Sequence, residues 1–507
     1  MSTACRIAFR ANIHRVMNIL EKDVIIVGAG PVGLFLAREL VRHGKRVLLV
    51  EKNAAQSQHS KALAVMPRTL EVFDMAGIAA PFLAAAHVVT KAALLDGQDR
   101  LGVLPIEPAL TRYPYVAMIP QDVSEGLLLS ALRRCGGDVS YGTEALAIEH
   151  TSEAVNVHLR SGGQDYSVSA AYVVGTDGAH SSVRHALGLD FAGGSYAAAF
   201  VLADIETTGD VPVDEMQLCP HAAGALACFP MSASRRRIVA MVDAEPTAGP
   251  DLAFVQHLLD TRGLSALRAT RLIWGSNFEI HHRQASSMRS GRVFLAGDAA
   301  HIHSPFGAQG MNTGLQDAWN LAWKLRLALD GAATPELLDS YAVERHAVAQ
   351  RVIRLTDSIT RVMASRHRVV QALRKRLIPI LTRLDSFKRR FVDTLTELSV
   401  RYAQSPVIVG KGRRALDEPL ADGARLYECL GDGFVLLAPQ HAPALDRVLA
   451  RYSVTVARKA HLQKDGLRLI RPDGYVAFES TTATVFDLQR LEAALRMQVL
   501  PGASSVA

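Results

Sequence analysis

Short runs of consecutive apolar residues, each ending at glycine or an acidic residue, predict strands that are buried on both faces. Such runs occupy residues 23–27, 46–50, 172–175 and 293–296. Apolar positions at helical spacing follow the first run as far as Gly44, and a second helical pattern begins near Met311. Strands that alternate with helices in this way predict an α/β fold with a doubly wound sheet.

The pattern changes between residues 189 and 280, where alternating apolar and polar stretches predict a separate β-sheet. Four large apolar residues there, Phe229, Met231, Met241 and Trp274, are candidates to line a substrate site. Plain core packing is the alternative for most of them. Long helical patterns then run from residue 344 to about 402. Further short strands and a last helix from about Asp487 complete the chain.

Composition describes an ordinary globular protein of 507 residues with a net charge of +7. Basic residues cluster between Arg361 and Arg390, and apolar residues interrupt the cluster at helical spacing. This pattern favours a solvated helical face over a nucleic-acid or membrane surface. The five cysteines are scattered without metal-site spacing, which predicts reduced thiols, no metal and a cytoplasmic location.

No apolar run approaches the ~18 residues needed to span a bilayer. The segment before Glu21 contains arginines and no acidic residue, but it lacks the apolar core of a secretory signal. An upstream extension before Met17 is the favoured interpretation of this segment, and a transit peptide is the alternative.

A glycine-rich turn, GAGPVG, follows the first strand and contains Gly28, Gly30 and Gly33. The strand, turn, helix and second strand give the dinucleotide-binding pattern in its required context. Gly28 makes the turn, Gly30 admits a pyrophosphate, and Gly33 allows the helix and strand to pack closely. Glu51 ends the second strand, where a carboxylate holds ribose hydroxyls.

A second motif, LAGDAAHIHSPFGAQGMNTG, places Gly297 and Asp298 at a strand end and a helix start near Met311. The carboxylate can accept hydrogen bonds from a polyol, and the helix N-terminus is suited to an electron-rich group. A flavin with its ribityl chain has both features. A third motif, GTDGAHSSVR, also joins a strand end to a helix start and contains Asp177. An ordinary strand–loop–helix, packed for stability, is the alternative for both motifs.

Together, the three motifs resemble the signatures of FAD-dependent aromatic hydroxylases of the para-hydroxybenzoate hydroxylase type. The similarity runs from Asp23 to near the end of the chain and includes KALAVMPRTLEVF, YPYVAMIPQDVSEGLLL and LIRPDGYVAF. It implies a Rossmann-type FAD-binding domain in two parts, an inserted β-sheet substrate domain and a small thioredoxin-like C-terminal domain. The implied boundaries are 22–188 with an insertion near 80–118, 189–282, 283–404 with a helical segment, and 405–500.

The resemblance also implies roles for individual residues. Gly28, Gly30, Pro31, Val32, Gly33 and Glu51 would hold the ADP half of FAD, and Asp298, after Gly297, would bind the ribityl chain. Gln121 would contact the flavin, and Asp177 would serve both FAD and a transient NADPH or NADH. Lys61 replaces the arginine that is usual in the family. Pro305 would lie near the site of dioxygen reaction, and the N–H groups of Gly310, Met311 and Asn312 would meet the pyrimidine edge of the flavin ring.

The implied reaction is hydroxylation of a phenolic or polycyclic aromatic substrate through a flavin hydroperoxide, with water excluded from the site. A Baeyer–Villiger or epoxidising activity on a polyketide, or a flavin-binding protein without turnover, are the alternatives. No substrate base can be assigned, and His221, Arg235 and Tyr196 are only candidates. The C-terminal region has no CxxC, which argues against a redox role. A monomer or homodimer without nucleic-acid or membrane partners is expected.

Overall fold

The structure, a computed structural model, describes most of the chain from Leu20 to Pro501. The described residues are 20–57, 60–107, 110–151, 153–242, 249–304, 307–365, 367–439, 443–452, 456–460 and 466–501. The expectation for the segment before Glu21 therefore lies almost wholly outside the described residues, as does the one for Pro305.

The first sheet contains the parallel strands that the apolar runs predict, and antiparallel strands extend it. Its main strand order is β17-β18-β11-β1-β2-β8, and β9 and β10 extend it beside β11. The carboxyl-terminal parts of the central strands β1 and β11 are apolar and buried, with Val24, Ile25, Ile26, Val173 and Val174 fully inaccessible to solvent. The strands are β1 (Leu20–Val27), β2 (Val47–Glu51), β8 (Val139–Tyr141), β9 (Thr143–His150), β10 (Val155–Ser161), β11 (Gln164–Gly175), β17 (Arg289–Ser290) and β18 (Val293–Leu295).

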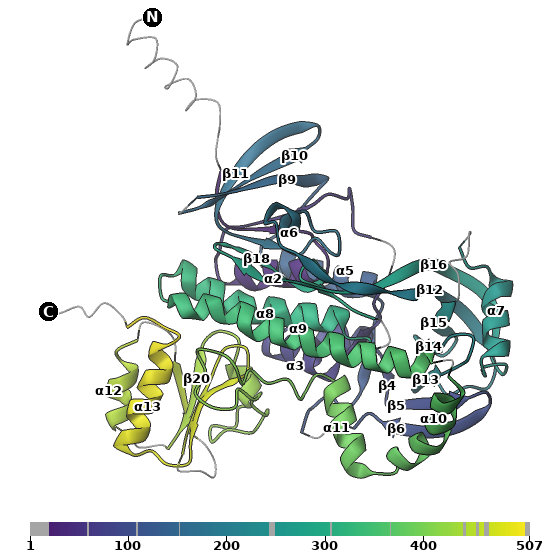
Figure 1. The fold of residues 1–507 in the computed structure, drawn as a ribbon. Coiled ribbons are helices and arrows are strands. Elements are labelled where there is room, and N and C mark those ends of the chain that lie inside the picture. The colour runs from purple at the N-terminus through teal and green to yellow at the C-terminus, as the bar shows by residue number, and fades with distance from the viewer. Residues whose placement is uncertain are drawn as a thin grey trace, which may run out of the picture.

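The chain leaves this sheet after β11 to build most of a second one, and it returns at β17 and β18. The second sheet has the order β19-β16-β12-β15-β14-β13-β5-β6, and it occupies the right of Figure 1. Its strands are β5 (Lys91–Asp96), β6 (Asp99–Pro105), β12 (Phe191–Thr208), β13 (Glu215–Cys219), β14 (Leu226–Pro230), β15 (Arg235–Val242), β16 (Arg268–Ala285) and β19 (His301–Ile302). A small sheet of β3 (Ala64–Val65), β7 (Val116–Met118) and β4 (His87–Val89) completes this half of the molecule.

Two long helices, α8 (Gly310–Leu329) and α9 (Pro335–Ala364), run side by side through the middle of the molecule (Figure 1). The helix α8 also packs on α2, which in turn contacts β1 and β2 of the first sheet. The helical pattern predicted from 344 to about 402 divides into most of α9, then α10 and α11, and the last of these ends at Leu395, earlier than expected. The other helices before the C-terminal part are α2 (Pro31–Arg42), α3 (Pro67–Met75), α4 (Ala79–Ala85), α5 (Gln121–Arg134), α6 (Ser182–Ala186), α7 (Leu252–Thr261), α10 (Arg368–Leu381) and α11 (Asp385–Leu395).

A four-stranded sheet with the order β21-β20-β22-β23 forms the C-terminal part, at the lower left of Figure 1. Its central strand, β20, is buried along its whole length, and apolar residues of α8 such as Trp323 and Leu327 pack in the same core. The elements are β20 (Phe434–Ala438), α12 (Pro443–Leu449), β21 (Val456–Ala460), β22 (Leu467–Ile470), β23 (Val476–Ser480) and α13 (Val485–Arg496). The strands and the last helix that the sequence predicts for this part are therefore confirmed within the described residues.

Candidate functional site

Three motifs that are far apart in the sequence meet at one edge of the first sheet. Strand β11 pairs in parallel with both β1 and β18, and the pairs Val27–Gly175 and Gly175–Leu295 place the three carboxyl ends side by side. The glycine turn, Asp177 and Gly297 follow these strand ends. The crevice outside the carboxyl ends of parallel strands is where open α/β sheets bind ligands.

The glycine turn after β1 is a close-packed loop. Gly28 has φ +104°, a conformation that side chains rarely adopt, and a Cβ on Gly33 would lie 2.0 Å from the Gly28 carbonyl oxygen. The hydroxyl of Thr176 donates to the carbonyls of Val27 and Gly28 and so fixes the turn against β11. Pro31 begins α2, and Val32 lies against Gly297 and Gly314, because a Cβ on either glycine would meet its methyl group.

We expect Gly33→Ala to distort this turn and to abolish nucleotide binding, because the new methyl group cannot coexist with the Gly28 carbonyl. Gly126→Ala on α5, where nothing lies within 4 Å of the new Cβ, should leave binding unchanged. The amount of cofactor that stays bound through gel filtration, measured by its absorbance, is compared between the two variants. Full cofactor content in Gly33→Ala would contradict the predicted role of the turn.

Glu51 ends β2 and faces the glycine turn, as the dinucleotide pattern predicts. Its carboxylate accepts hydrogen bonds from the Ala29 N–H at 3.0 Å and from the side chain of Asn53 at 2.6 Å. The carboxylate therefore lies next to the turn and can accept hydrogen bonds from ribose hydroxyls.

Asp298 follows β18 in a short 3₁₀ turn (Gly297–Ala299) and remains exposed to solvent. Burial by the surrounding protein nevertheless raises the pKa of its carboxyl, although His301 and Lys61 oppose the rise. A side chain that is accessible yet surrounded by protein lies in a concave part of the surface. Asp298 is therefore placed to accept hydrogen bonds from a bound polyol.

A buried carboxylate that the sequence analysis missed holds the backbone of this turn. Asp317 on α8 accepts hydrogen bonds from the Gly297 N–H at 3.0 Å, from His301 at 2.7 Å and from Arg345 at 2.6 Å. Burial alone would raise the pKa of Asp317, but Arg345 and His301 hold it below its usual value. Asp317 lies within an apolar helical pattern, and a charged residue at a core position was the available signal.

The N-terminus of α8 is open to a ligand. The helix begins at Gly310, Gln309 is its N-cap without a side-chain hydrogen bond, and the first turn has no acidic residue. Its N–H groups, including those of Gly310, Met311 and Asn312, thus keep their partial positive charge. The side chain of Asn312 is occupied elsewhere, since it bonds to the backbone of Ala64 and Met66.

His303 lies beside this helix start. A Cβ on Gly310 would be 3.7 Å from its Nε2, and that nitrogen is buried without a hydrogen-bond partner among the described residues. Burial lowers the pKa of His303 to about 4, so its ring is neutral at physiological pH. A buried, unpaired ring nitrogen next to open helix N–H groups favours a polar ligand at this position.

Lys61 lies in a loop whose charge acts on the Asp298 carboxyl, and Gln121 is the first residue of α5 beside that loop. The side chain of Gln121 accepts a hydrogen bond from the Ala62 N–H at 3.0 Å and donates one to Glu125 at 2.8 Å. Burial raises the pKa of Glu125 to about 7. Gln121 therefore fixes the loop that carries Lys61, and direct contact of either residue with a cofactor stays a prediction.

Asp177 caps a helix in the structure. Its carboxylate accepts hydrogen bonds from Ser181, from Ser182 and from the Val183 N–H, all at the start of α6. These bonds stabilise the turn after β11. Contact of Asp177 with FAD or with a nicotinamide cofactor stays a prediction.

Comparison with known proteins decides the family. The FAD binding domain family matches residues 21–356, and the family described as aromatic-ring hydroxylase, C-terminal, matches residues 410–499. The chain belongs to the FAD-dependent aromatic-ring hydroxylases. The cofactor of this hydroxylase is FAD, as the sequence analysis predicts.

Similar proteins cover almost the whole hydroxylase. A rifampicin monooxygenase of Streptomyces venezuelae is 35% identical over 471 residues, which are 90% of this chain and 95% of that protein. A 12-dehydrotetracycline 5-monooxygenase/anhydrotetracycline 6-monooxygenase of Streptomyces rimosus is 34% identical, covering 92% and 97%. The solved structure of an anhydrotetracycline hydroxylase from Streptomyces rimosus superposes with a TM-score of 0.80 at 32% identity and covers 95% of this chain and all of that one.

The residues of the hydroxylase fit FAD. The glycine turn leaves no room for a Cβ at Gly33, Asp298 is accessible in a concave region, and the first turn of α8 is uncapped beside the unpaired nitrogen of His303. No group of side chains suited to a metal ion occurs in the described parts of the chain.

The apolar candidates for the substrate site lie together on one face of the second sheet. Phe229, Met231 and Met241 are buried in one cluster, and Trp274 packs against it. The same cluster contains Met66 and contacts Ala308, which lies two residues before α8 begins. This face of the sheet is therefore directed toward the open helix N-terminus.

The candidates for a substrate base have other partners. His221 accepts a hydrogen bond from the Ala223 N–H in a turn, and Arg235 lies 3.7 Å from Asp204. The side chain of Tyr196 lies outside the described residues. These contacts do not place His221 or Arg235 at the cofactor site.

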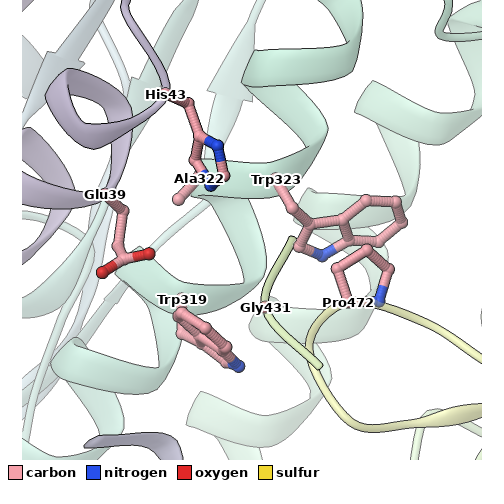
Figure 2. A pocket seen from close by; sticks show the side chains of 7 residues that line it. All are labelled: Glu39, His43, Trp319, Ala322, Trp323, Gly431 and Pro472. Atoms are coloured by element: carbon pink, nitrogen blue, oxygen red, sulfur yellow. The ribbon is translucent and has the colours of Figure 1, made fainter. Parts of the chain in front are cut away.

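A small cavity opens elsewhere, between α2, α8 and the C-terminal part (Figure 2). Glu39, His43, Trp319, Ala322, Trp323, Gly431 and Pro472 line it. It is barely large enough for one water molecule, and its α8 residues lie two to four turns beyond the helix start. This cavity is therefore separate from the cofactor site.

Proposed function

We propose that this hydroxylase uses NADPH or NADH and dioxygen to hydroxylate a polycyclic phenolic compound. The observation that carries the proposal is the open N-terminus of α8, which lies between the three strand ends and the apolar face of the second sheet. A cofactor held there would have its ring beside a substrate on that face. The tetracycline and rifampicin monooxygenases to which the chain is similar are named for polycyclic substrates, which favours this class over simple phenols.

The protein's contribution to this reaction is binding, orientation and exclusion of water. We propose that Gly28, Gly30, Gly33 and Glu51 hold the ADP half of FAD and that Asp298 holds the ribityl chain. Bound FAD supplies the transfer of electrons to dioxygen and of one oxygen atom to the substrate. The N–H groups at the start of α8, which have no side-chain cap, would stabilise negative charge on a reduced ring bound there.

The apolar residues Phe229, Met231, Met241 and Trp274 form the proposed substrate face, and residues 189–282 form the proposed substrate domain. Pro305 is proposed to lie near the site of dioxygen reaction. We also propose a cytoplasmic enzyme that acts as a monomer or a homodimer. The ratio of the oxidation rates of NADPH and NADH identifies its electron donor.

The test is oxidation of NADPH by the purified yellow protein with and without a panel of simple and polycyclic phenols. Faster oxidation in the presence of a polycyclic phenol, together with a product that carries one additional oxygen atom, supports the proposal. An ester or lactone product indicates a Baeyer–Villiger reaction, and an epoxide indicates epoxidation. Bound FAD without oxidation of NADPH under any condition indicates a flavin-binding protein without turnover.

We expect Asp298→Ala to lose most bound FAD, since the ribityl hydroxyls lose their acceptor at the end of β18. The affinity for FAD should fall by roughly tenfold to a hundredfold, as for a lost hydrogen bond to a charged group. Titration of the FAD-free protein with FAD, followed by quenching of flavin fluorescence, measures the change. Asp210→Ala, in a loop of the second sheet, is the control and should bind FAD normally. Unchanged affinity in Asp298→Ala would remove this residue from the site.

A further inference from the structure

A row of large apolar side chains lies exposed along α10 and the turn that follows it. We name this row the α10 stripe. The exposed fractions are 66% for Val369, 49% for Leu373, 43% for Leu377, 56% for Ile380 and 49% for Leu384. Their spacing of three or four residues places them on one face of the helix. Soluble proteins rarely expose a contiguous apolar patch without a partner for it.

The orientation of α10 is fixed by contacts on its other face. Lys375 forms an ion pair with Asp96 of β5 at 2.6 Å, and Thr382 lies against Gly102 of β6. Arg374 is buried and donates a hydrogen bond to the carbonyl of Val362 near the end of α9. The helix therefore packs on the outer edge of the second sheet (Figure 1), and the stripe is directed away from it.

Basic residues predominate along the stripe, because the acidic residues next to it are paired, Asp96 with Lys375 and Asp385 with Lys388. Residues 358–384 include no Asp or Glu, and their basic residues are Arg361, Arg366, Arg368, Arg374, Lys375, Arg376 and Arg383. Arg376 and Arg383 are exposed and have no ion-pair partner among the described residues. A partner for this surface must therefore be both apolar and anionic.

A second copy of the chain and the chain's own N-terminal segment are poor partners for this basic surface. In a two-fold dimer through α10, the same basic surface of both copies would meet, which is unfavourable. The N-terminal residues 1–19 contain Arg6, Arg10 and Arg15 and no acidic residue, so this segment repels the surface as well. The stripe is wholly aliphatic, without the Trp and Tyr that usually anchor protein interfaces.

We propose that α10 docks the protein on an anionic lipid surface. The stripe enters the boundary between headgroups and acyl chains, and Arg376 and Arg383 bind lipid phosphates. This is peripheral binding, and within the described residues no helix has the length and apolarity to cross a bilayer. The proposal replaces the expectation of a simply solvated basic face, and it does not depend on the proposed reaction.

The test is co-sedimentation of the FAD-loaded protein with vesicles. One set contains phosphatidylcholine alone, and the other contains equal parts of phosphatidylcholine and phosphatidylglycerol. We expect binding to the mixed vesicles only, and weaker binding at high salt. The combined variants Arg376→Glu with Arg383→Glu, and Leu373→Ser with Leu377→Ser, should each weaken partitioning about tenfold or more.

The matched control replaces two exposed apolar residues at the start of a different helix, α13. Val485→Ser with Phe486→Ser, where the side chains are 73% and 66% exposed, should bind the mixed vesicles as the unchanged protein does. Thermal unfolding and FAD content of all variants should equal those of the unchanged protein. Equal binding to both kinds of vesicle, no binding, or full binding by either α10 variant overturns the proposal. A dimer that the α10 variants dissociate, without vesicle binding, overturns it in favour of self-association.

Discussion

Glu344→Gln is expected to lower the free energy of unfolding by about 3–5 kcal/mol, because it removes one charge from a fully buried ionic network. Glu344 on α9 accepts hydrogen bonds from Lys324 of α8 at 2.8 Å and from Arg471, before β23, at 2.6 and 2.9 Å. Burial alone would raise the pKa of Glu344, but Arg471 and Lys324 hold it far below its usual value. Without this carboxylate, two buried cations share only Asp473.

Denaturant unfolding followed by tryptophan fluorescence measures this loss, since Trp323 lies 5.2 Å from the guanidinium of Arg471. The matched control, Glu336→Gln, alters an exposed residue of the same helix and should change stability by less than about 0.5 kcal/mol. Adding Lys324→Met to Glu344→Gln removes the unpaired cation and should recover more than half of the loss. A loss below about 1 kcal/mol for the single variant would show that the network contributes little to folding.

The parts of the fold that the sequence predicts correctly depend on local patterns. The apolar runs that became β1, β2 and β18 each end at a glycine or an acidic residue, and parallel strands place their carboxyl ends together. For this reason Gly28, Glu51 and Asp298, which are distant in sequence, could be expected at one edge of a sheet.

The supporting residues could not be predicted because their contacts are non-local. Asp317 contacts Arg345, and Arg471 contacts Glu344 across 127 residues, and no spacing rule indicates such pairs. The motif of Asp177 was recognised from local sequence, but the hydrogen bonds of its carboxylate to the start of α6 were not predicted. The exposure of the α10 stripe also could not be predicted, since an apolar pattern at helical spacing does not show whether the apolar face is covered by other parts of the protein.

Glu397 is a further residue that local patterns did not reveal, and its backbone is unusual. Its φ of +62° is in the left-handed region, which is costly for a residue with a side chain, and it is 2% exposed. Thr313 and Gln316 of α8 donate hydrogen bonds to its carboxyl group. Ala308, with φ +51°, lies at the other side of the same helix start. The strain is therefore concentrated where the cofactor ring is proposed to bind.

We expect Glu397→Gln to remove a pH dependence of stability. Burial raises the pKa of Glu397 to about 7 from an ordinary value of 4.5, although Thr313, Arg345 and Gln316 oppose the rise. Below pH 4.5 the group is protonated in both states, and its contribution to stability is complete. As the pH rises toward 7, only the unfolded chain ionises, so the folded protein loses roughly 3 kcal/mol, and nothing further changes above that range. Glutamine does not titrate and keeps the backbone and a carbonyl acceptor.

Thermal unfolding of the FAD-loaded protein between pH 5 and 8 therefore separates the two proteins. The stability of Glu397→Gln relative to the unchanged protein should increase with pH and level off above the pKa of about 7. Glu144→Gln, an exposed carboxyl on β9, is the control and should show no such difference. Identical pH profiles for Glu397→Gln and the unchanged protein would mean that Glu397 ionises at an ordinary pKa, and that the strained turn carries no buried proton.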